Sequence, residues 1–311
     1  DPELSRGLGD VYKRQQYAEL AEITLSIIWK EVLFEFAKKF GPEPGNGAAV
    51  ISMGSLGSGL LHANSDLDLI IIYDADGNDQ SEGKRSLPAR QYYSRLTKAF
   101  ITAISAPMSE GRLYEIDMRL RPSGFQGPVA TSWNSYKNYQ RNEAWVWEHL
   151  ALTRARPVAG KVSVLNDFEK FRSSLLKSYC RENIFNELVN MRSRISQAKS
   201  LNPWDAKIGP GRLQDIDLLS QAGCLISRSA SRSTADGLET LVFGNFITQK
   251  EFSEIKAAIS QLWSWQIGLN ILFKGRAELE NMNVLENDAK VEIFEKQTLT
   301  EVKNSLHHLS N

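Results

Sequence analysis

Apolar residues recur at helical spacing across residues 17–39, which predicts an amphipathic helix. The segment 41–47 carries three glycines and two prolines, and we expect it to end this helix as a loop. Residues 48–53 are mostly small and apolar, which is typical of a buried strand. Residues 91–105 return to helical spacing and predict a second helix. The first hundred residues therefore mix helices and strands.

A glycine- and serine-rich turn at 54–59 leads to the segment Ser-Asp-Leu-Asp-Leu-Ile-Ile-Ile-Tyr at 65–73. Residues two apart on a strand project from the same face, so Asp66 and Asp68 can hold one cation together. An acidic pair at a strand end often only solvates a turn. The preceding small-residue turn changes this interpretation, because its backbone N–H groups can approach phosphate oxygens. We therefore predict a site for a metal-bound triphosphate.

Residues 113–121 alternate between apolar and charged side chains, which predicts a half-buried strand. Its charged face carries Asp117, Arg119 and Arg121. A solvated sheet face would explain this row, but both signs of charge together also suit a site for metal and polyphosphate. We predict Asp117 as a third carboxylate, with the two arginines available to phosphate oxygens.

From Trp133 onward the pattern is helical, with breaks at 156–160, at 202–211 and around residue 236. We expect an α+β catalytic domain over 17–160 and an all-helical bundle over 161–311. Residues 1–16 fit neither pattern and resemble translated vector sequence, so we expect them to be vector-derived or disordered.

Charge and composition exclude some classes of protein. The 311 residues carry equal numbers of basic and acidic side chains, and 42% are hydrophobic, as in ordinary globular domains. This balance gives no reason to expect nucleic acid or an anionic membrane as a partner, and no apolar run approaches the roughly 18 residues of a membrane span. The two cysteines form no metal motif, and the four histidines lack metal-site spacing. We expect a cytoplasmic protein that uses magnesium rather than zinc.

Four sequence blocks, in order, resemble the adenylylating C-terminal region of the bacterial glutamine synthetase adenylyltransferase/adenylyl-removing family. They are M-G-S-L-G-S-G with S-D-L-D-L-I-I-I-Y-D within 53–74, L-Y-E-I-D-M-R-L-R-P-S-G at 113–124, N-E-A-W-V-W-E-H-L-A-L-T-R-A-R-P-V-A-G at 142–160 and K-I-G-P-G-R-L-Q-D-I-D-L-L-S-Q at 207–221. The resemblance runs from about Leu20 to the C-terminus. The block at 144–149 resembles the adenylylating half of that family rather than the AMP-removing half.

The resemblance implies a polymerase-β-like nucleotidyltransferase fold and transfer of AMP from ATP to a tyrosine of glutamine synthetase. It also implies regulation by the PII signal protein. Two Mg²⁺ ions would then be held by the three carboxylates, and Asp117 would also accept the tyrosine proton. The residues expected to contact nucleotide phosphates are Gly54, Ser55, Arg119, Arg121 and Lys207.

Several other conspicuous residues have plainer explanations. We expect the three tryptophans at 133, 145 and 147 to pack in a core or a domain junction, and Arg154 and Arg156 to cap a helix. Leu262, Trp265, Leu269 and Leu272 share helical spacing and predict a bundle core. The roles of Glu148, His149, Arg212 and Asp217 stay open, and the last two depart from the residues commonest in the family.

Three alternatives to AMP addition remain. The same fold could remove AMP by phosphorolysis, or transfer UMP as in the related enzyme that modifies PII. The helical region and the Trp-Glu-His block argue against both. The chain could instead be a regulatory module that binds PII or glutamine synthetase without efficient turnover. The intact set Asp66, Asp68 and Asp117 argues against such an inactive module.

Overall fold

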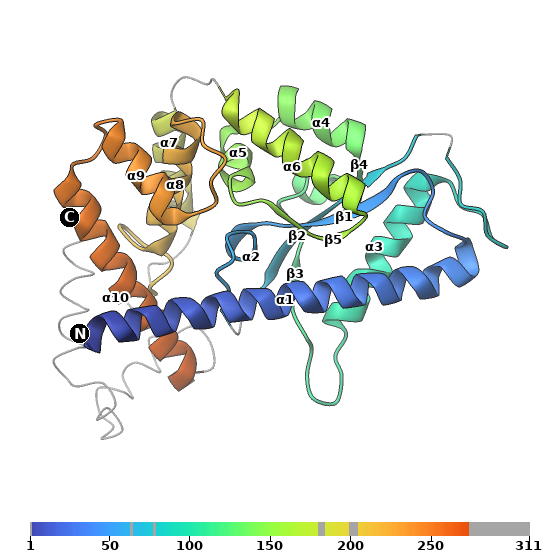
Figure 1. Ribbon diagram of the computed structural model, residues 1–311, viewed down its shortest axis with the longest axis horizontal. Helices are drawn as coiled ribbons and strands as arrows, with labels where there is room; N and C mark the ends of the chain where they lie inside the picture. Colours follow the sequence, from blue (N-terminus) through green and yellow to red (C-terminus); the bar gives the residue numbers. More distant parts are fainter. Residues whose placement is uncertain (1, 63–64, 77–78, 180–183, 199–204, 274–311) are drawn as a thin grey trace. The chain divides into compact units, whose positions relative to one another are not determined.

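The computed structural model describes residues 2–62, 65–76, 79–179, 184–198 and 205–273 (Figure 1). Contacts divide the chain into two compact units. One unit consists of Tyr12–Tyr179 with Arg228–Arg232, and the other of Asp1–Val11, Cys180–Ser227 and Ser233–Asn311. In this division the boundary that we expected near residue 160 falls after α6 (Val162–Lys177), because that helix packs on strands β1 (Gly47–Ser52) and β5 (Arg156–Gly160) of the first unit.

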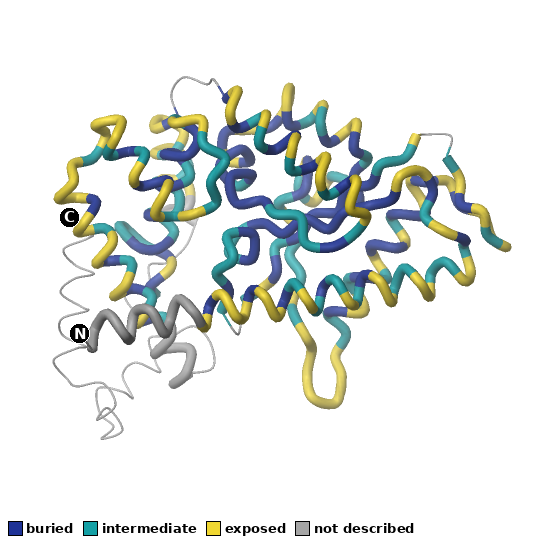
Figure 2. The backbone as a smooth tube through the Cα atoms, viewed as in Figure 1, coloured by how far each residue is buried: buried dark blue, intermediate teal, exposed yellow. Residues whose placement is uncertain are grey.

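Helix α1 (Pro2–Phe40) begins well before residue 17, where the sequence pattern places its start. Arg14 is buried, and its carbonyl accepts a hydrogen bond from the Leu61 N–H at 3.1 Å. Of the two expectations for residues 1–16, vector origin or disorder, disorder is therefore wrong at least for this turn of the helix. Downstream, Leu25 and Trp29 face the core, and the opposite face of α1 is exposed (Figure 2).

A five-stranded mixed sheet forms the centre of the first unit. Four of its strands lie in the order β3-β2-β1-β5, and the fifth, β4, pairs with β2 outside this order. Strand β1 (Gly47–Ser52) pairs antiparallel with both β2 (Leu67–Asp74) and β5 (Arg156–Gly160). The short strands β3 (Ile116–Asp117) and β4 (Thr131–Ser132) both pair parallel with β2. Strand β2 pairs with three other strands, and its apolar residues are buried on both faces because helices cover both sides of the sheet.

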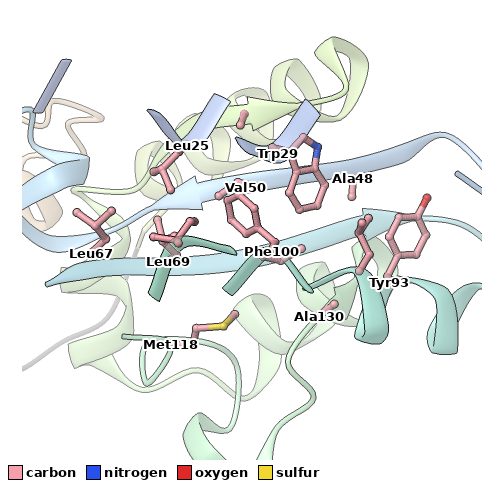
Figure 3. Close-up of a cluster of buried hydrophobic side chains, with 14 of the residues drawn as sticks. Leu25, Trp29, Ala48, Val50, Leu67, Leu69, Tyr93, Phe100, Met118 and Ala130 are labelled. Atoms are coloured by element: carbon pink, nitrogen blue, oxygen red, sulfur yellow. The ribbon is translucent and has the colours of Figure 1, made fainter. Parts of the chain in front are cut away.

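Helices cover both faces of the sheet. One face packs against α1 and α3 (Ala89–Ser105) through the core that Figure 3 shows in close-up, a single cluster that includes Leu67 and Leu69 of β2 and Phe100 and Tyr93 of α3. On the other side of the sheet, α4 (Trp133–Asn142) contacts β2, and α6 contacts β1 and β5. Leu67 and Leu69 are both buried in this cluster, so they project from the face of β2 opposite to that of Asp68.

The strands differ from the predictions at two places. The alternating segment 113–121 forms a strand only at Ile116–Asp117, because the chain turns directly after Met118. The segment 156–160, predicted as a break in the helical pattern, is indeed not helical, and it forms strand β5, which was not predicted. It pairs with β1 through an irregular register at Val50 and Ile51, beside Pro157, and a proline is tolerated there because β5 is an edge strand.

The second unit is helical in its described residues, as expected. It contains α7 (Ile184–Ala198), α8 (Leu213–Ile226), α9 (Thr234–Phe243) and α10 (Gln249–Phe273). Leu262 and Trp265 are buried in its core as predicted, while Leu269 and Leu272 lie outside the residues whose side chains are described. None of the helices in the described part of the chain combines the length and apolarity needed to cross a membrane.

Candidate active site

The turn after β1 consists of small residues because the carboxylate of Asp68 lies against it. The chain leaves β1 and forms the one-turn helix α2 (Gly54–Gly57). Gly54 has a φ of 52°, and a Cβ there would lie 2.3 Å from Asp68 Oδ2. The Met53 N–H also donates to the Asp68 carbonyl at 2.8 Å. Both the backbone conformation and the space taken by the carboxylate therefore require glycine at position 54.

Strands β2 and β3 bring two of the predicted carboxylates side by side. Asp68 lies opposite Asp117 in their parallel register, so the two side chains project from the same face of the sheet. Asp66 is exposed and immediately precedes the first residue of β2. The Leu67 N–H donates to the Glu115 carbonyl at 2.8 Å, which extends the pairing up to the acidic pair.

Asp117 is held by Arg119, two residues further along the chain. The Arg119 backbone N–H donates to Oδ1 at 2.8 Å, and its Nε donates to Oδ2 at 2.6 Å. Burial raises the pKa of Asp117, but the hydrogen bonds from Arg119 and the charges of Arg119 and Arg121 outweigh burial and hold this pKa below its usual range. Asp117 is therefore an anion at neutral pH.

Arg119 is influenced by all three carboxylates. The hydrogen bond and charge of Asp117 raise the pKa of its guanidinium, and the charges of Asp68 and Asp66 act in the same direction. The guanidinium itself is 65% exposed, so it can change partner without leaving a buried space. One exposed cation thus offsets part of the negative charge of the cluster.

The chemistry of these donors suits magnesium. Carboxylate oxygens are hard ligands of the kind that Mg²⁺ uses. Among the described residues, no three His, Cys, Asp or Glu side chains already stand in the arrangement of a metal site. Asp117 is bound to Arg119 instead. Asp66 and Asp68 could hold a cation directly, whereas Asp117 has to share its oxygens with Arg119 or exchange that partner.

Arg121 donates through its guanidinium to backbone carbonyls. Its side chain is buried, and it donates to the carbonyls of Met118 at 2.8 Å, Gly127 at 3.2 Å and Phe125 at 3.3 Å. The arginine thus stabilises the loop that contains the 3₁₀ turn η1 (Gly124–Gln126). The alternation that assigned it to the charged face does not continue past Met118. Lys207 belongs to the other unit, so its contact with phosphate stays a prediction.

Glu148 and His149 stabilise the start of α5 (Val146–Leu152). Glu148 accepts hydrogen bonds from the Tyr139 hydroxyl and from the Trp145 backbone N–H, both at 2.8 Å. The His149 Nε2 lies 2.8 Å from the Gln140 carbonyl. Both side chains are buried, and these contacts fasten α5 to α4. Their role here is to position one helix on another.

The three tryptophans differ in burial. Trp133 is buried and stacks on Tyr136, as expected for a core residue. Trp145 is 65% exposed and Trp147 is 40% exposed, so of the two alternatives, a core or a domain junction, core packing is wrong for both. The sequence could not separate these cases, because an aromatic residue next to a helix start has the same pattern whether it faces inward or outward.

In the second unit, Arg212 covers the start of α8. It is buried, and its Nη1 donates to the Ile208 carbonyl at 2.9 Å and also to the Asp205 carbonyl. These contacts are those of an arginine that covers the start of a helix. Asp217 accepts a hydrogen bond from the Thr234 hydroxyl at 3.4 Å, within the same unit.

Arg156 is a site residue that the sequence analysis missed. It lies on β5 rather than at a helix end, and its Nη2 donates to the Leu56 carbonyl of α2 at 2.8 Å and to Glu22 of α1. Its backbone carbonyl accepts a hydrogen bond from the Ser52 hydroxyl at 3.0 Å. The only sequence signal was its position in the Arg-Ala-Arg-Pro block, which does not reveal a partner 100 residues earlier.

Comparison of the sequence with known protein families gives two matches along the chain. The family model for glutamate-ammonia ligase adenylyltransferase matches residues 14–171, just over half of the chain, and includes the turn, the three carboxylates and β5. The chain belongs to this family. A second family model, for the GlnD PII-uridylyltransferase, matches residues 182–280 in the helical unit.

Individual relatives support the same family assignment. Three of them carry the name bifunctional glutamine synthetase adenylyltransferase/adenylyl-removing enzyme. The one from Agrobacterium fabrum is 41% identical over 244 residues, 75% of this chain and 24% of its own length. Those from Brucella suis and Rhizobium meliloti are 40% and 42% identical, over 71% and 67% of this chain and 23% and 22% of their own lengths. The chain thus spans about a quarter of the length of these relatives.

Proposed function

We propose that this chain transfers AMP from ATP to a tyrosine hydroxyl of glutamine synthetase. The observation that carries the proposal is the pairing of Asp68 with Asp117 beside the Gly54 turn, in a chain of the adenylyltransferase family. We further propose that the first unit has the polymerase-β-like nucleotidyltransferase fold. The central sheet with acidic residues at one end of β2 supports this assignment.

The proposed chemistry asks the protein mainly for positioning and charge stabilisation. Gly54 and Ser55 would present backbone N–H groups to the phosphates, and the exposed guanidinium of Arg119 would neutralise negative charge on them. Asp66, Asp68 and Asp117 would hold two Mg²⁺ ions. When bound, such ions polarise the phosphoryl oxygens and lower the pKa of the incoming hydroxyl.

Asp117 is the proposed acceptor of the tyrosine proton. A tyrosine hydroxyl has an ordinary pKa near 10, so it needs a nearby base at neutral pH. The lowered pKa of Asp117 keeps the group ionised and able to accept the hydrogen bond of the hydroxyl. Asp117 is held by Arg119, whose side chain is 65% exposed, so the carboxylate can reorient when the substrate arrives.

The direction of the reaction and the base of the nucleotide belong to the proposal as well. The residues that match the adenylyltransferase family include the whole catalytic cluster, which favours ATP. The helical unit does not favour one base over the other, because its residues 182–280 match the PII-uridylyltransferase model. That match supports PII as a regulatory partner. We place the protein in the cytoplasm, where glutamine synthetase and PII are found together.

A labelling experiment tests the proposal. The chain is incubated with Mg²⁺, α-labelled ATP and glutamine synthetase, beside an Asp66→Asn/Asp68→Asn double variant. We expect label on the synthetase with release of pyrophosphate, and no label with the double variant. Asp74→Asn is the matched control, because Asp74 ends the same strand far from the turn and accepts a hydrogen bond from Asn46.

Two further reactions separate the alternatives. Incubation of adenylylated synthetase with phosphate would release ADP if the chain removed AMP, and labelled UTP with PII would label that protein if the chain were a uridylyltransferase. Tight binding of synthetase or PII without any of these three products would support the regulatory module instead. Each of these outcomes contradicts the proposal.

A further inference from the structure

The turn at 54–59, which we propose binds the nucleotide phosphates and call the phosphate turn, depends on contacts with other parts of the chain. Helix α2 contains four residues, too few to be stable on its own, so its orientation depends on what surrounds it. One contact is with the chain just before β5, since a Cβ on Gly57 would lie 2.1 Å from the Arg154 carbonyl. The end of α2 therefore lies directly on this segment, and glycine at position 57 permits the close approach.

Arg156 makes the second contact. The Leu56 carbonyl accepts a hydrogen bond from Arg156 Nη2 at 2.8 Å and another from the Gly59 N–H at 2.9 Å. Arg156 itself is fixed on two sides. Its Cα lies opposite Ser52 in the pairing of β1 with β5, and its guanidinium forms an ion pair with Glu22 of α1.

The ion pair with Glu22 distinguishes Arg156 from the arginines that we expect to bind phosphate. Its side chain is 30% exposed and that of Glu22 is 25% exposed, so both are partly shielded from water. Burial raises the pKa of Glu22, and the charge and hydrogen bond of Arg156 oppose this rise. The positive charge of Arg156 is thus balanced within the protein by Glu22. The same Nη2 that donates to Glu22 also donates to the Leu56 carbonyl.

We infer that Arg156 is a positioning residue for the nucleotide. It holds the Leu56 carbonyl, and through it α2, in the orientation that presents Gly54 and Ser55 to the phosphates, while Glu22 aligns its guanidinium. Arg156 acts through the backbone of the turn and does not touch the substrate. This inference rests on the proposed function, since it names the support of the same site.

A matched arginine provides the control. Arg232 Nε donates to the Ala155 carbonyl at 2.8 Å and its guanidinium pairs with Glu169, so it has the same two types of partner. Its side chain is 25% exposed, close to the value for Arg156, and it makes no hydrogen bond to α2 among the contacts described for it. Loss of stability should be similar in Arg156→Met and Arg232→Met, whereas only the first should alter the turn.

The experiment measures ATP binding by calorimetry and hydrogen exchange across residues 54–59. For Arg156→Met we expect about tenfold weaker ATP binding, as for the loss of one charge-assisted hydrogen bond, and faster exchange in the turn. Arg232→Met should change neither. Arg156→Lys keeps the charge for Glu22 but has a single ammonium group, so it should fold and still bind ATP more weakly. The KM for ATP should rise more than kcat falls.

Failure of this inference is distinct from failure of the proposed function. If ATP binding and exchange in both Arg156 variants match those of Arg232→Met, Arg156 does not position the turn, whatever reaction the chain performs. If the unaltered chain binds ATP but labels no synthetase, the proposed reaction fails. A weaker ATP affinity in Arg156→Lys would support the positioning role even then.

Discussion

Asp68 Oδ2 lies 2.3 Å from the point where a Cβ on Gly54 would stand. Because Gly54 has no Cβ, the Asp68 carboxylate can occupy this space. Because the turn and the carboxylate occupy adjoining space, a change at either one should move the other. The relationship joins the expected phosphate-binding residues to the expected metal ligands.

Gly54→Ala should reduce adenylyl transfer by about 100-fold, since the new methyl group displaces Asp68 and a misplacement of about 1 Å has effects of this size. Gly59→Ala is the control. Gly59 also has a positive φ, 76°, but its Cβ would lie 3.7 Å from the nearest atom, the Nη2 of Arg156. Both variants should lose stability through backbone strain. Equal transfer rates in the two variants would contradict the role of the Gly54 contact.

Arg119→Met should tighten the binding of Mn²⁺ alone by about fivefold, because it removes a cation beside the three carboxylates. Mn²⁺ bound to the chain can be counted by electron paramagnetic resonance. Arg112→Met is matched to it, because Arg112 forms an exposed ion pair with Glu115 near the same strand. If Mn²⁺ binds more weakly after Arg119→Met, the guanidinium helps to build the metal site rather than competing for it.

Glu43 makes stability depend on pH. Burial raises its pKa to about 7, although the hydrogen bond from Ala48 and the charge of Lys161 both lower it. The folded state thus keeps a proton that the unfolded chain loses near pH 4.5, so the stabilisation is present at low pH and is lost as the pH rises towards 7.

Glu43→Gln should remove this dependence. We expect the free energy of unfolding of the unaltered chain to fall by about 2 kcal/mol relative to the variant between pH 5 and pH 8. Urea unfolding at the two pH values measures it. Glu35→Gln, which changes an exposed carboxylate paired with Lys38, should leave the profile parallel to that of the unaltered chain. A parallel profile for Glu43→Gln would show that this carboxyl is ionised throughout the range.

Arg172→Met should destabilise the first unit by about 3 kcal/mol, because it leaves buried carbonyls without a donor. Arg172 is fully buried and donates to the carbonyls of Leu152 and Ala230, both at 2.9 Å, and to that of Thr153. Lys170→Met, on an exposed face of the same helix, should have little effect. Denaturant titration gives both values, and a loss below about 1 kcal/mol for Arg172→Met would mean that water replaces the guanidinium.

The sequence predicts the local parts of the site well. The strand after Asp66, the helix α3 and the turn at Gly54 depend on periodicity and small residues within about ten positions. The alternation at 113–121 misled the analysis, since it assigned Arg121 to the face of Asp117. The structure ends the strand at Asp117 and turns Arg121 towards backbone carbonyls.

Partners distant in the chain could not be predicted. Strand β5 is short, begins with Arg156 and Pro157 and has no alternation, so only its pairing with β1 reveals it as a strand. The contacts of Arg156 with Glu22 and Leu56 have no local signal, because all three residues lie in separate segments. The burial of Glu43 likewise depends on how α3 and Lys161 close over the loop, which no pattern near Glu43 encodes.

The pairing of Ser52 with Arg156 also sets an order of events during synthesis. The hydroxyl and the carbonyl that it binds are 104 residues apart, so a growing polypeptide has made the turn and Asp68 long before the ribosome adds β5. Bringing such distant segments together costs loop-closure entropy and is slow compared with forming the turn. A nascent chain that stops before residue 156 therefore contains all three carboxylates but lacks the hydrogen bond from Arg156 to the turn. Competence for nucleotide should arise only when translation has passed this strand.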